Sequence, residues 1–188
     1  MIESKNDLKI YLQEDKKALY RKTRRPAFYD DIWKFEIALR KCEYYNNVKG
    51  LFHKYLLLYW KYKKYKLSQV TGFSIPLNVF GKGLAIVHVG PIIVHSAVRV
   101  GDYCRIHVGV NIGTAAGPEV LTPKIGNSVY IGPGAKIFGN IQIADYVAIG
   151  ANAVVNKDIL TPSVSVGGIP AKIISDKGSK GTMYDPAS

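Results

Sequence analysis

The sequence predicts a mainly-β protein, a triangular parallel coil of short strands that follows a short α-helical N-terminal region. Two observations carry this prediction: a six-residue spacing of aliphatic side chains and a change of composition near Thr71. Seventeen of the 18 glycines follow that residue, whereas nine of the 13 tyrosines and both tryptophans precede it. We therefore divide the chain into a helical region (1–70), a coil domain (71–174) and a flexible tail (175–188).

The N-terminal region shows its clearest helical signals over residues 31–67. Asp30-Asp31 is a suitable N-terminal cap and Gly50 a suitable stop, which predicts one helix on each side of Gly50. Residues 51–67 mix lysine with leucine, tyrosine and tryptophan. Such a helix could pack on the coil or on another subunit. It could also lie on the inner face of a membrane, with its lysines on anionic lipid. Nucleic-acid binding is a third reading, which rests on charge alone.

The coil domain is predicted from two columns of aliphatic residues at a spacing of six. The first column contains Val94, Val100, Ile106, Ile112, Ile125, Ile131, Ile137, Ile143, Ile149 and Val155. The second contains Val129, Ala135, Ile141, Val147, Ala153 and Ile159. A period of six fits neither an α-helix nor simple strand alternation. It fits a short strand followed by a tight corner, so that three sides close one coil of about 18 residues around a stacked aliphatic core.

The sequence predicts one loop that interrupts this coil and a cover for each of its two ends. Residues 114–124 break the six-residue register, and a loop that projects from a rigid solenoid is a usual place for specificity. The two ends of the coil expose unpaired strand edges that need covers. We expect the helical region to cover one end and residues 168–175 to cover the other.

Composition excludes several classes of protein. Cys42 and Cys104 are the only cysteines, so a disulfide scaffold and a cysteine-rich zinc module are excluded. So few cysteines are consistent with a reducing cytoplasm. No apolar run reaches about 18 residues, and the first segment is charged rather than signal-like. We therefore expect a cytoplasmic protein. Without a P-loop or a Rossmann glycine fingerprint, nucleotide hydrolysis and hydride transfer have no support.

Three stretches carry a resemblance to a known family: GKGLAIVHVGPIIVHSAVRVGDYCRIHVGVNIGT (81–114), VVNKDI (154–159) and GGIPAKII (167–174). They resemble hexapeptide-repeat acyltransferases, in the branch of serine acetyltransferases and polysaccharide O-acetyltransferases. The resemblance implies a left-handed parallel β-helix, acetyl-CoA as the donor substrate, no metal, and a homotrimer whose donor sites lie between subunits.

The histidines are the candidate catalytic residues. His88 matches the catalytic histidine of the family, and a neutral imidazole suits removal of a proton from an acceptor hydroxyl. Counting hexads places His107 one coil away, near the same edge, so we name His88 and His107 as catalytic candidates. His95 could also help to shape the acceptor site.

The resemblance also implies a set of donor-binding residues. Backbone groups at Gly113 and Thr114 would hold the thioester carbonyl as charge develops. The pantetheine arm would contact the backbone of the coil, and Lys172 could meet the nucleotide phosphates. The other donor-binding candidates are Gly132, Gly134, Ala151, Asn156, Lys157 and Lys172.

The acceptor is the point on which the sequence departs from serine acetyltransferases. That family has an aspartate directly before the catalytic histidine and a second histidine in the loop, where this chain has Val87 and, at about the matching place, Thr122. Because free serine needs charged partners, we expect a sugar hydroxyl of a capsular or exopolysaccharide as the acceptor. The alternative is serine O-acetylation for cysteine biosynthesis. N-acetylation of an amino sugar, a zinc enzyme and a non-catalytic scaffold are further readings.

Overall fold

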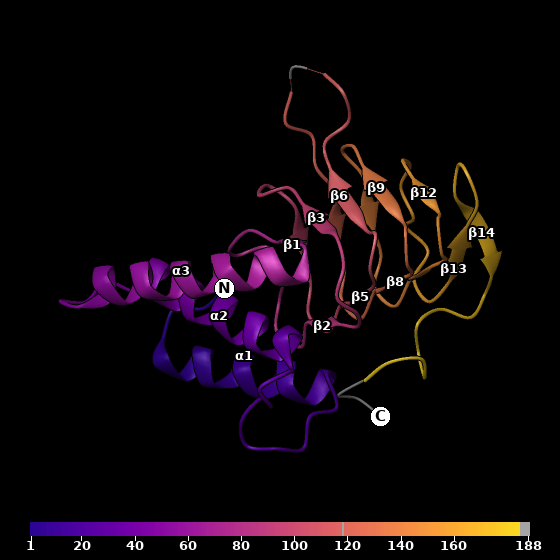
Figure 1. Cartoon of the computed structure of the whole chain (residues 1–188). Coiled ribbons are helices and arrows are strands. Elements are labelled where there is room, and N and C mark those ends of the chain that lie inside the picture. The colour runs from indigo at the N-terminus through magenta and orange to yellow at the C-terminus, as the bar shows by residue number, and fades with distance from the viewer. Residues whose placement is uncertain (118, 185–188) are drawn as a thin grey trace.

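A computed structural model describes residues 1–117 and 119–184, with three helices ahead of a coil of short strands (Figure 1). The helices are α1 (Lys5–Ala18), α2 (Asp31–Asn47) and α3 (His53–Thr71). The strands are β1 (Phe73–Ser74), β2 (Ala85–Ile86), β3 (Ile92–Val94), β4 (Arg99–Val100), β5 (Arg105–Ile106), β6 (Asn111–Gly113), β7 (Lys124–Ile125), β8 (Tyr130–Ile131), β9 (Lys136–Phe138), β10 (Gln142–Ile143), β11 (Ala148–Ile149), β12 (Val154–Val155), β13 (Ser165–Gly167) and β14 (Lys172–Ser175).

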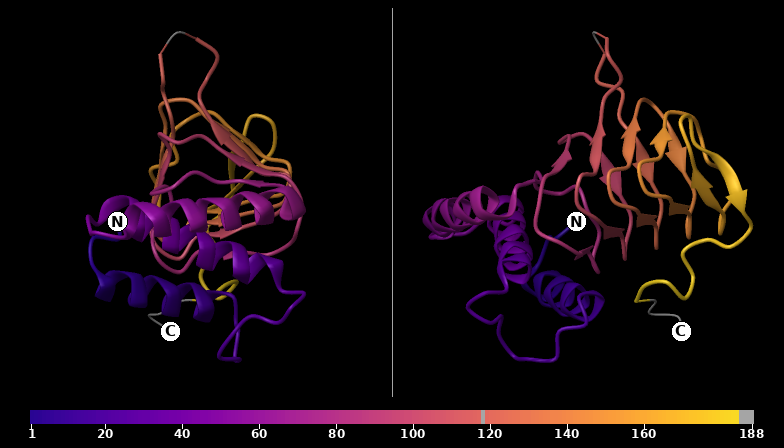
Figure 2. Two further views of the ribbon diagram at one scale, coloured as in Figure 1. Left: turned by 60° about the vertical axis from the view of Figure 1, so that its left-hand side comes forward. Right: turned by 45° about the vertical axis from the view of Figure 1, so that its right-hand side comes forward.

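The strands form the three sides of a prism, as the six-residue spacing predicts. One side has the order β1-β3-β6-β9-β12, the second β10-β7-β4, and the third β14-β13-β11-β8-β5-β2. All pairings are parallel except β13 with β14. Seen along its axis, the prism has a triangular outline (left view of Figure 2). Residues 114–123 leave this outline as a projecting loop, in which residue 118 lies outside the described part.

The core is the stack of the two predicted columns. Every residue of both columns is buried. In-register pairs, such as Ile106 with Ile131 and Ile131 with Ile149, stack aliphatic side chains of successive coils on one another. The burial of this continuous aliphatic stack is the main driving force for closing the coils.

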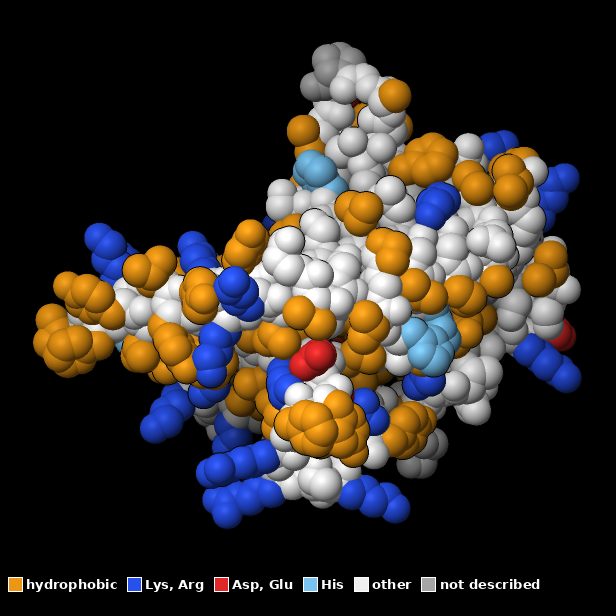
Figure 3. Space-filling model, viewed as in Figure 1, with side chains coloured by type: hydrophobic (Ala, Val, Ile, Leu, Met, Phe, Trp, Pro, Cys, Tyr) orange, Lys and Arg blue, Asp and Glu red, His pale blue; other side chains and the backbone are white. Residues whose placement is uncertain are grey.

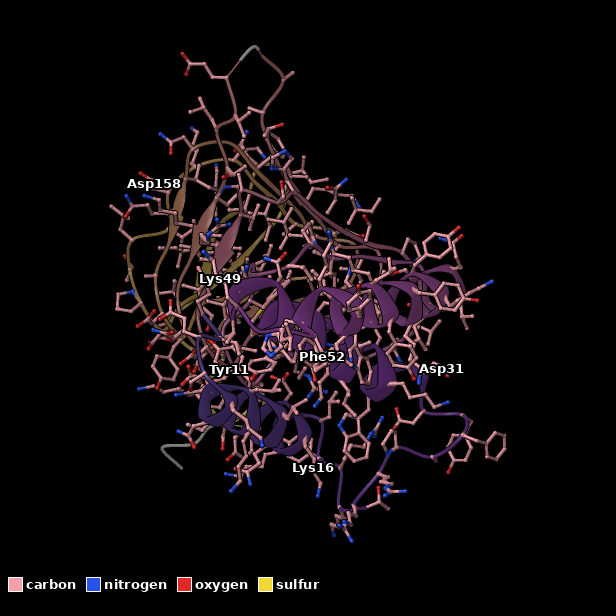
Figure 4. The ribbon with its side chains drawn as sticks, turned by 90° about the vertical axis from the view of Figure 1, so that its left-hand side faces the viewer. Tyr11, Lys16, Asp31, Lys49, Phe52 and Asp158 are labelled. Atoms are coloured by element: carbon pink, nitrogen blue, oxygen red, sulfur yellow. The ribbon has the colours of Figure 1, made fainter. Side chains whose placement is uncertain are left out.

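The helices cover the first open end of the prism through a buried ionic cluster. The Arg40 guanidinium bonds to Asp15 (Nε–Oδ2, 2.7 Å) and Glu43 (Nη1–Oε2, 3.0 Å), and donates to the carbonyls of Phe80 and Gly81. The carboxylates in turn accept edge N–H groups of the first coil: Asp15 from Leu84, Glu43 from Asn78, and Glu36 from Ile86. The unpaired edge is thereby satisfied by side chains, as a buried edge requires. Figure 4 shows the helices in front of the prism at this end.

The far end is covered by β14, which folds back antiparallel on β13 as its last strand. The chain then runs along a corner of the prism towards the helices (Figure 1). Ser179 is buried there, its N–H donates to Tyr146 O (2.9 Å), and its hydroxyl bonds to Ser128 O. Tyr184 stacks near Tyr103 and Tyr20. Residues 176–184 thus make specific contacts where we expected a flexible tail, and residues 185–188 of that expectation lie outside the described residues.

Among the described residues, no helix combines the length and the apolar character needed to cross a bilayer.

Candidate active site

The two candidate catalytic histidines meet at one corner of the prism. His88 follows β2 and His107 follows β5, and these strands pair in register, with Ile86 opposite Ile106. The Val87 N–H donates to Ile106 O (3.1 Å), which places His107 directly across from Val87. The imidazole centroids of His88 and His107 are 6.1 Å apart. The predicted proximity of the two rings is therefore confirmed, whereas their catalytic roles remain predictions.

The two rings differ in their surroundings. His88 is exposed, as a group that must meet an incoming substrate should be. His107 is half-buried, its Nε2 is buried without a hydrogen-bond partner in the described residues, and its ring lies 5.0 Å from the Tyr130 ring. Burial lowers the pKa of His107, and the positive charge of Arg105 and the neighbouring His88 lower it further. The site therefore favours a neutral imidazole at His107.

Tyr130 and Arg105 are site residues that the sequence reasoning missed. Each directly precedes a core isoleucine and stacks on the same side of the prism, since Arg105 pairs with Tyr130 in the β5–β8 register. The same hexad count that joined His88 to His107 could have found them.

A column of glycines continues from His107 along the prism. His107 N–H donates to Ile131 O, Gly132 N–H to Ile149 O and Gly150 N–H to Val166 O, so His107, Gly132 and Gly150 stack across successive coils. A Cβ at Gly132 would lie only 2.8–2.9 Å from the backbone of Ile149, Gly150 and Ala151, so the close approach of the coils itself requires glycine. Gly132 itself is buried, so an extended pantetheine arm could follow this corner only along the more exposed backbone of Gly134, Gly150 and Ala151.

The other donor-binding candidates fall into two groups. Gly134 and Ala151 lie at the same corner as the glycine column, because Gly134 N–H donates to Val108 O and Asn152 N–H donates to Pro133 O. Lys172 begins β14 on the same side of the prism as β5 and β8.

The second group lies along a different edge. Gly113 ends β6, with Thr114 after it, and Asn156 and Lys157 follow β12, on the side of the prism that contains β6, β9 and β12. Within a single chain, the histidine corner and these four donor candidates therefore lie on different edges of the prism.

His95 does not join the pair. It follows β3, on a different side of the prism from β2 and β5, and its Nδ1 accepts the N–H of Ala97 (3.1 Å). That bond closes a local turn, which gives the ring a structural task.

No group of three or more His, Cys, Asp or Glu side chains in the described part of the chain is arranged to hold a metal ion.

Comparisons with known proteins agree with this architecture. Residues 122–157 match the family described as bacterial transferase hexapeptide (six repeats). A serine acetyltransferase of Synechococcus elongatus is 40% identical over 111 residues, a match that covers 58% of this chain and only 45% of that protein. The crystal structure of a Brucella abortus serine acetyltransferase is 30% identical with a TM-score of 0.69, over 90% of this chain and 69% of that one. The same enzyme in complex with coenzyme A is also similar, at 27% identity and a TM-score of 0.69, over 94% of this chain and 71% of that one.

These relatives correct the predicted branch and acceptor. They are serine acetyltransferases, so the prediction of a polysaccharide O-acetyltransferase is wrong. It rested on Val87 and Thr122, two positions that bear on acceptor contacts, whereas the similarity extends over the whole repeat framework. The fold class is confirmed as a left-handed parallel β-helix with an N-terminal helical region. The chain belongs to the hexapeptide-repeat transferase family.

Proposed function

We propose that this protein is an acetyl-CoA-dependent serine O-acetyltransferase with His88 as its general base. The observation that carries the proposal is the exposed His88 beside His107 at one end of a side-chain-free glycine column. The similarity to serine acetyltransferases supports serine as the acceptor, and the Brucella abortus complex with coenzyme A supports the donor.

In the proposed reaction, His88 takes the proton of the serine hydroxyl as that oxygen attacks the thioester carbonyl. The tetrahedral intermediate collapses with cleavage of the carbon–sulfur bond, and the coenzyme A thiolate leaves and takes up the proton that His88 holds. The products are O-acetylserine and coenzyme A, and the base is regenerated.

The neutral state favoured at His107 assists this step. A protonated His107, 6.1 Å between centroids from His88, would oppose the positive charge that His88 acquires in the transition state. Because burial lowers the pKa of His107, that repulsion is avoided near neutral pH. His107 is in this proposal a positioning residue, whose neutral ring lies beside His88.

The donor is proposed to lie along the glycine column, with its thioester at His88. Backbone of Gly134 and Ala151 would contact the arm, whereas Gly132 is buried and would only keep the coils close together. Lys172 is exposed and could meet phosphate oxygens near the far end.

The remaining candidates, Gly113, Thr114, Asn156 and Lys157, lie on another edge of the prism. They can contribute only if a second subunit brings that edge to the histidine corner. We therefore propose a homotrimer with composite sites between prisms.

The test is release of coenzyme A thiol from acetyl-CoA with L-serine, compared with L-alanine, which lacks the hydroxyl. We expect serine-dependent release that falls about 10²–10⁴-fold in His88→Ala. His53→Ala is the matched control, since His53 begins α3, outside the prism, and bonds to Val48 O, so this variant should retain turnover. Equal release with alanine, or full activity in His88→Ala, would refute the proposal.

A further inference from the structure

Helix α3 carries an unpartnered stripe of aromatic and aliphatic side chains. Tyr55, Leu58, Tyr62 and Tyr65 recur at spacings of three and four residues, which places them on one helical face. Their exposed fractions lie between 58% and 73%. Leu51 and Phe52, just before the helix, are also exposed. Exposed apolar residues in a contiguous row indicate an interaction surface rather than chance.

The opposite face of α3 holds the helix to the protein. Trp60, Lys64 and Leu67 are half-buried, with the Lys64 ammonium over the Phe35 ring and Leu67 against the main core. The stripe therefore points away from the rest of the chain. Figure 1 shows α3 reaching beyond the prism, and Figure 3 shows apolar side chains mixed with basic ones over that projecting end.

Lysines flank the stripe, and none of them forms an ion pair with a described residue. Lys54, Lys61, Lys63 and Lys66 are exposed on α3, and no Asp or Glu occurs anywhere between residues 44 and 101. Two of these ammonium groups lie over tyrosine rings of their own helix, Lys63 over Tyr59 (4.9 Å) and Lys66 over Tyr62 (5.7 Å). The face offers positive charge beside amphipathic rings, the pattern of a helix that lies in a lipid interface.

We propose that α3 docks the protein on the surface of an anionic phospholipid bilayer. Lipid phosphates would pair with the lysines while Tyr55, Leu58 and Tyr62 enter the headgroup region, where tyrosine is favoured. A second copy of α3 on the same face would bring lysine against lysine with no carboxylate on either helix, which is unfavourable. This docking is additional to the proposed transferase activity and does not depend on it.

The test is co-sedimentation of the full chain with vesicles of phosphatidylglycerol and phosphatidylcholine in equal parts, and with vesicles of phosphatidylcholine alone. We expect binding to the anionic vesicles that weakens as salt is raised. Lys54→Gln/Lys61→Gln/Lys66→Gln should weaken binding about fivefold per lysine. The matched control Lys9→Gln/Lys124→Gln/Lys177→Gln removes the same charge from other exposed positions and should bind like the parent.

A second variant, Tyr55→Ser/Leu58→Ser, separates insertion from charge. Because both side chains are exposed, the fold should survive, which circular dichroism checks. We expect at least about a tenfold loss of vesicle binding. Unchanged binding of this variant, equal binding to both kinds of vesicle, or no binding at all would overturn the proposal. So would an oligomer that this variant dissociates, or capture of single-stranded RNA without vesicle binding.

Discussion

At the scale of single residues, the electrostatics around His107 give a direct test of the site. Replacing Arg105 with Gln removes a positive charge that lowers the pKa of His107, so we expect that pKa to rise towards its ordinary value. NMR titration of the histidine ring protons measures it. A His107 pKa that stays constant or falls would contradict the assignment.

The same shift has a consequence for stability with a definite sign. The folded state resists protonation of His107, while the unfolded chain accepts the proton below about pH 6.5. Stability should therefore be lost as pH falls below about 6.5 and through the lower folded pKa. His107→Gln should lose less stability over that range in thermal unfolding. A parallel dependence in both proteins would show that His107 is not responsible.

The glycine column makes the next prediction at residue scale. Gly132→Ala places a Cβ 2.8–2.9 Å from three backbone groups of the next coil, none of which can rotate away. We expect a loss of about 1–3 kcal/mol in the free energy of unfolding, measured with urea. Gly113→Ala is the matched control, because its Cβ would meet only Asn111 Oδ1, at 3.8 Å. Equal stability of the two variants would contradict a close coil spacing at Gly132.

At the scale of elements, the helical cap depends on carboxylates with different tasks. Glu36 accepts the Ile86 N–H through Oε1, but its Oε2 is buried without a partner in the described residues. Burial, with the nearby Asp15, raises the pKa of Glu36 well above its usual value. In the unfolded chain this carboxyl ionises above about pH 4.3, so its contribution to stability is lost as pH rises towards the folded pKa.

Glu36→Gln should therefore stabilise the protein near about pH 8 and change little near about pH 4, because Gln keeps the acceptor and carries no charge. Melting temperature against pH measures this. Glu43→Gln is the contrast, since Glu43 pairs with the buried Arg40, and its loss should cost about 3–5 kcal/mol. A Glu36→Gln variant that is less stable at both pH values would contradict this account.

The same elements show what the sequence could predict. The columns from Val94 to Ile159 are periodic, so the prism, its core and the meeting of His88 with His107 follow from counting. The cap lies outside this six-residue period, because Asp15 comes from one helix and Glu36 and Glu43 from another, and all three bond to an edge 35 to 69 residues away. Such pairings become visible only once the helices are docked. The contacts of Ser179 at the corner of the prism could not be predicted from composition either, since they depend on a single small residue at one position.

At the scale of the whole molecule, the split between two prism edges makes oligomerisation part of the proposed chemistry. Within one chain, His88 and His107 lie along one edge of the prism, whereas Gly113 and Lys157 lie along another. The loop from 114 to 123 projects outwards from that second edge (Figure 2). Its residue Val120 is exposed. An exposed apolar loop beside half of a site is suited to complete the site of a neighbouring subunit.

Mixed oligomers test this arrangement. One chain carries His88→Ala, and the other has residues 114–122 replaced by a short glycine-serine linker; each alone should be inactive. If a site joins His88 of one subunit to the loop of the next, random mixing after refolding should restore about one quarter of the sites. If each site lies within one chain, no mixture can contain an intact site, and turnover should stay at the level of the separate variants. The mixing ratio adds a control, because restored activity must peak at equal amounts of the two chains and vanish at either extreme.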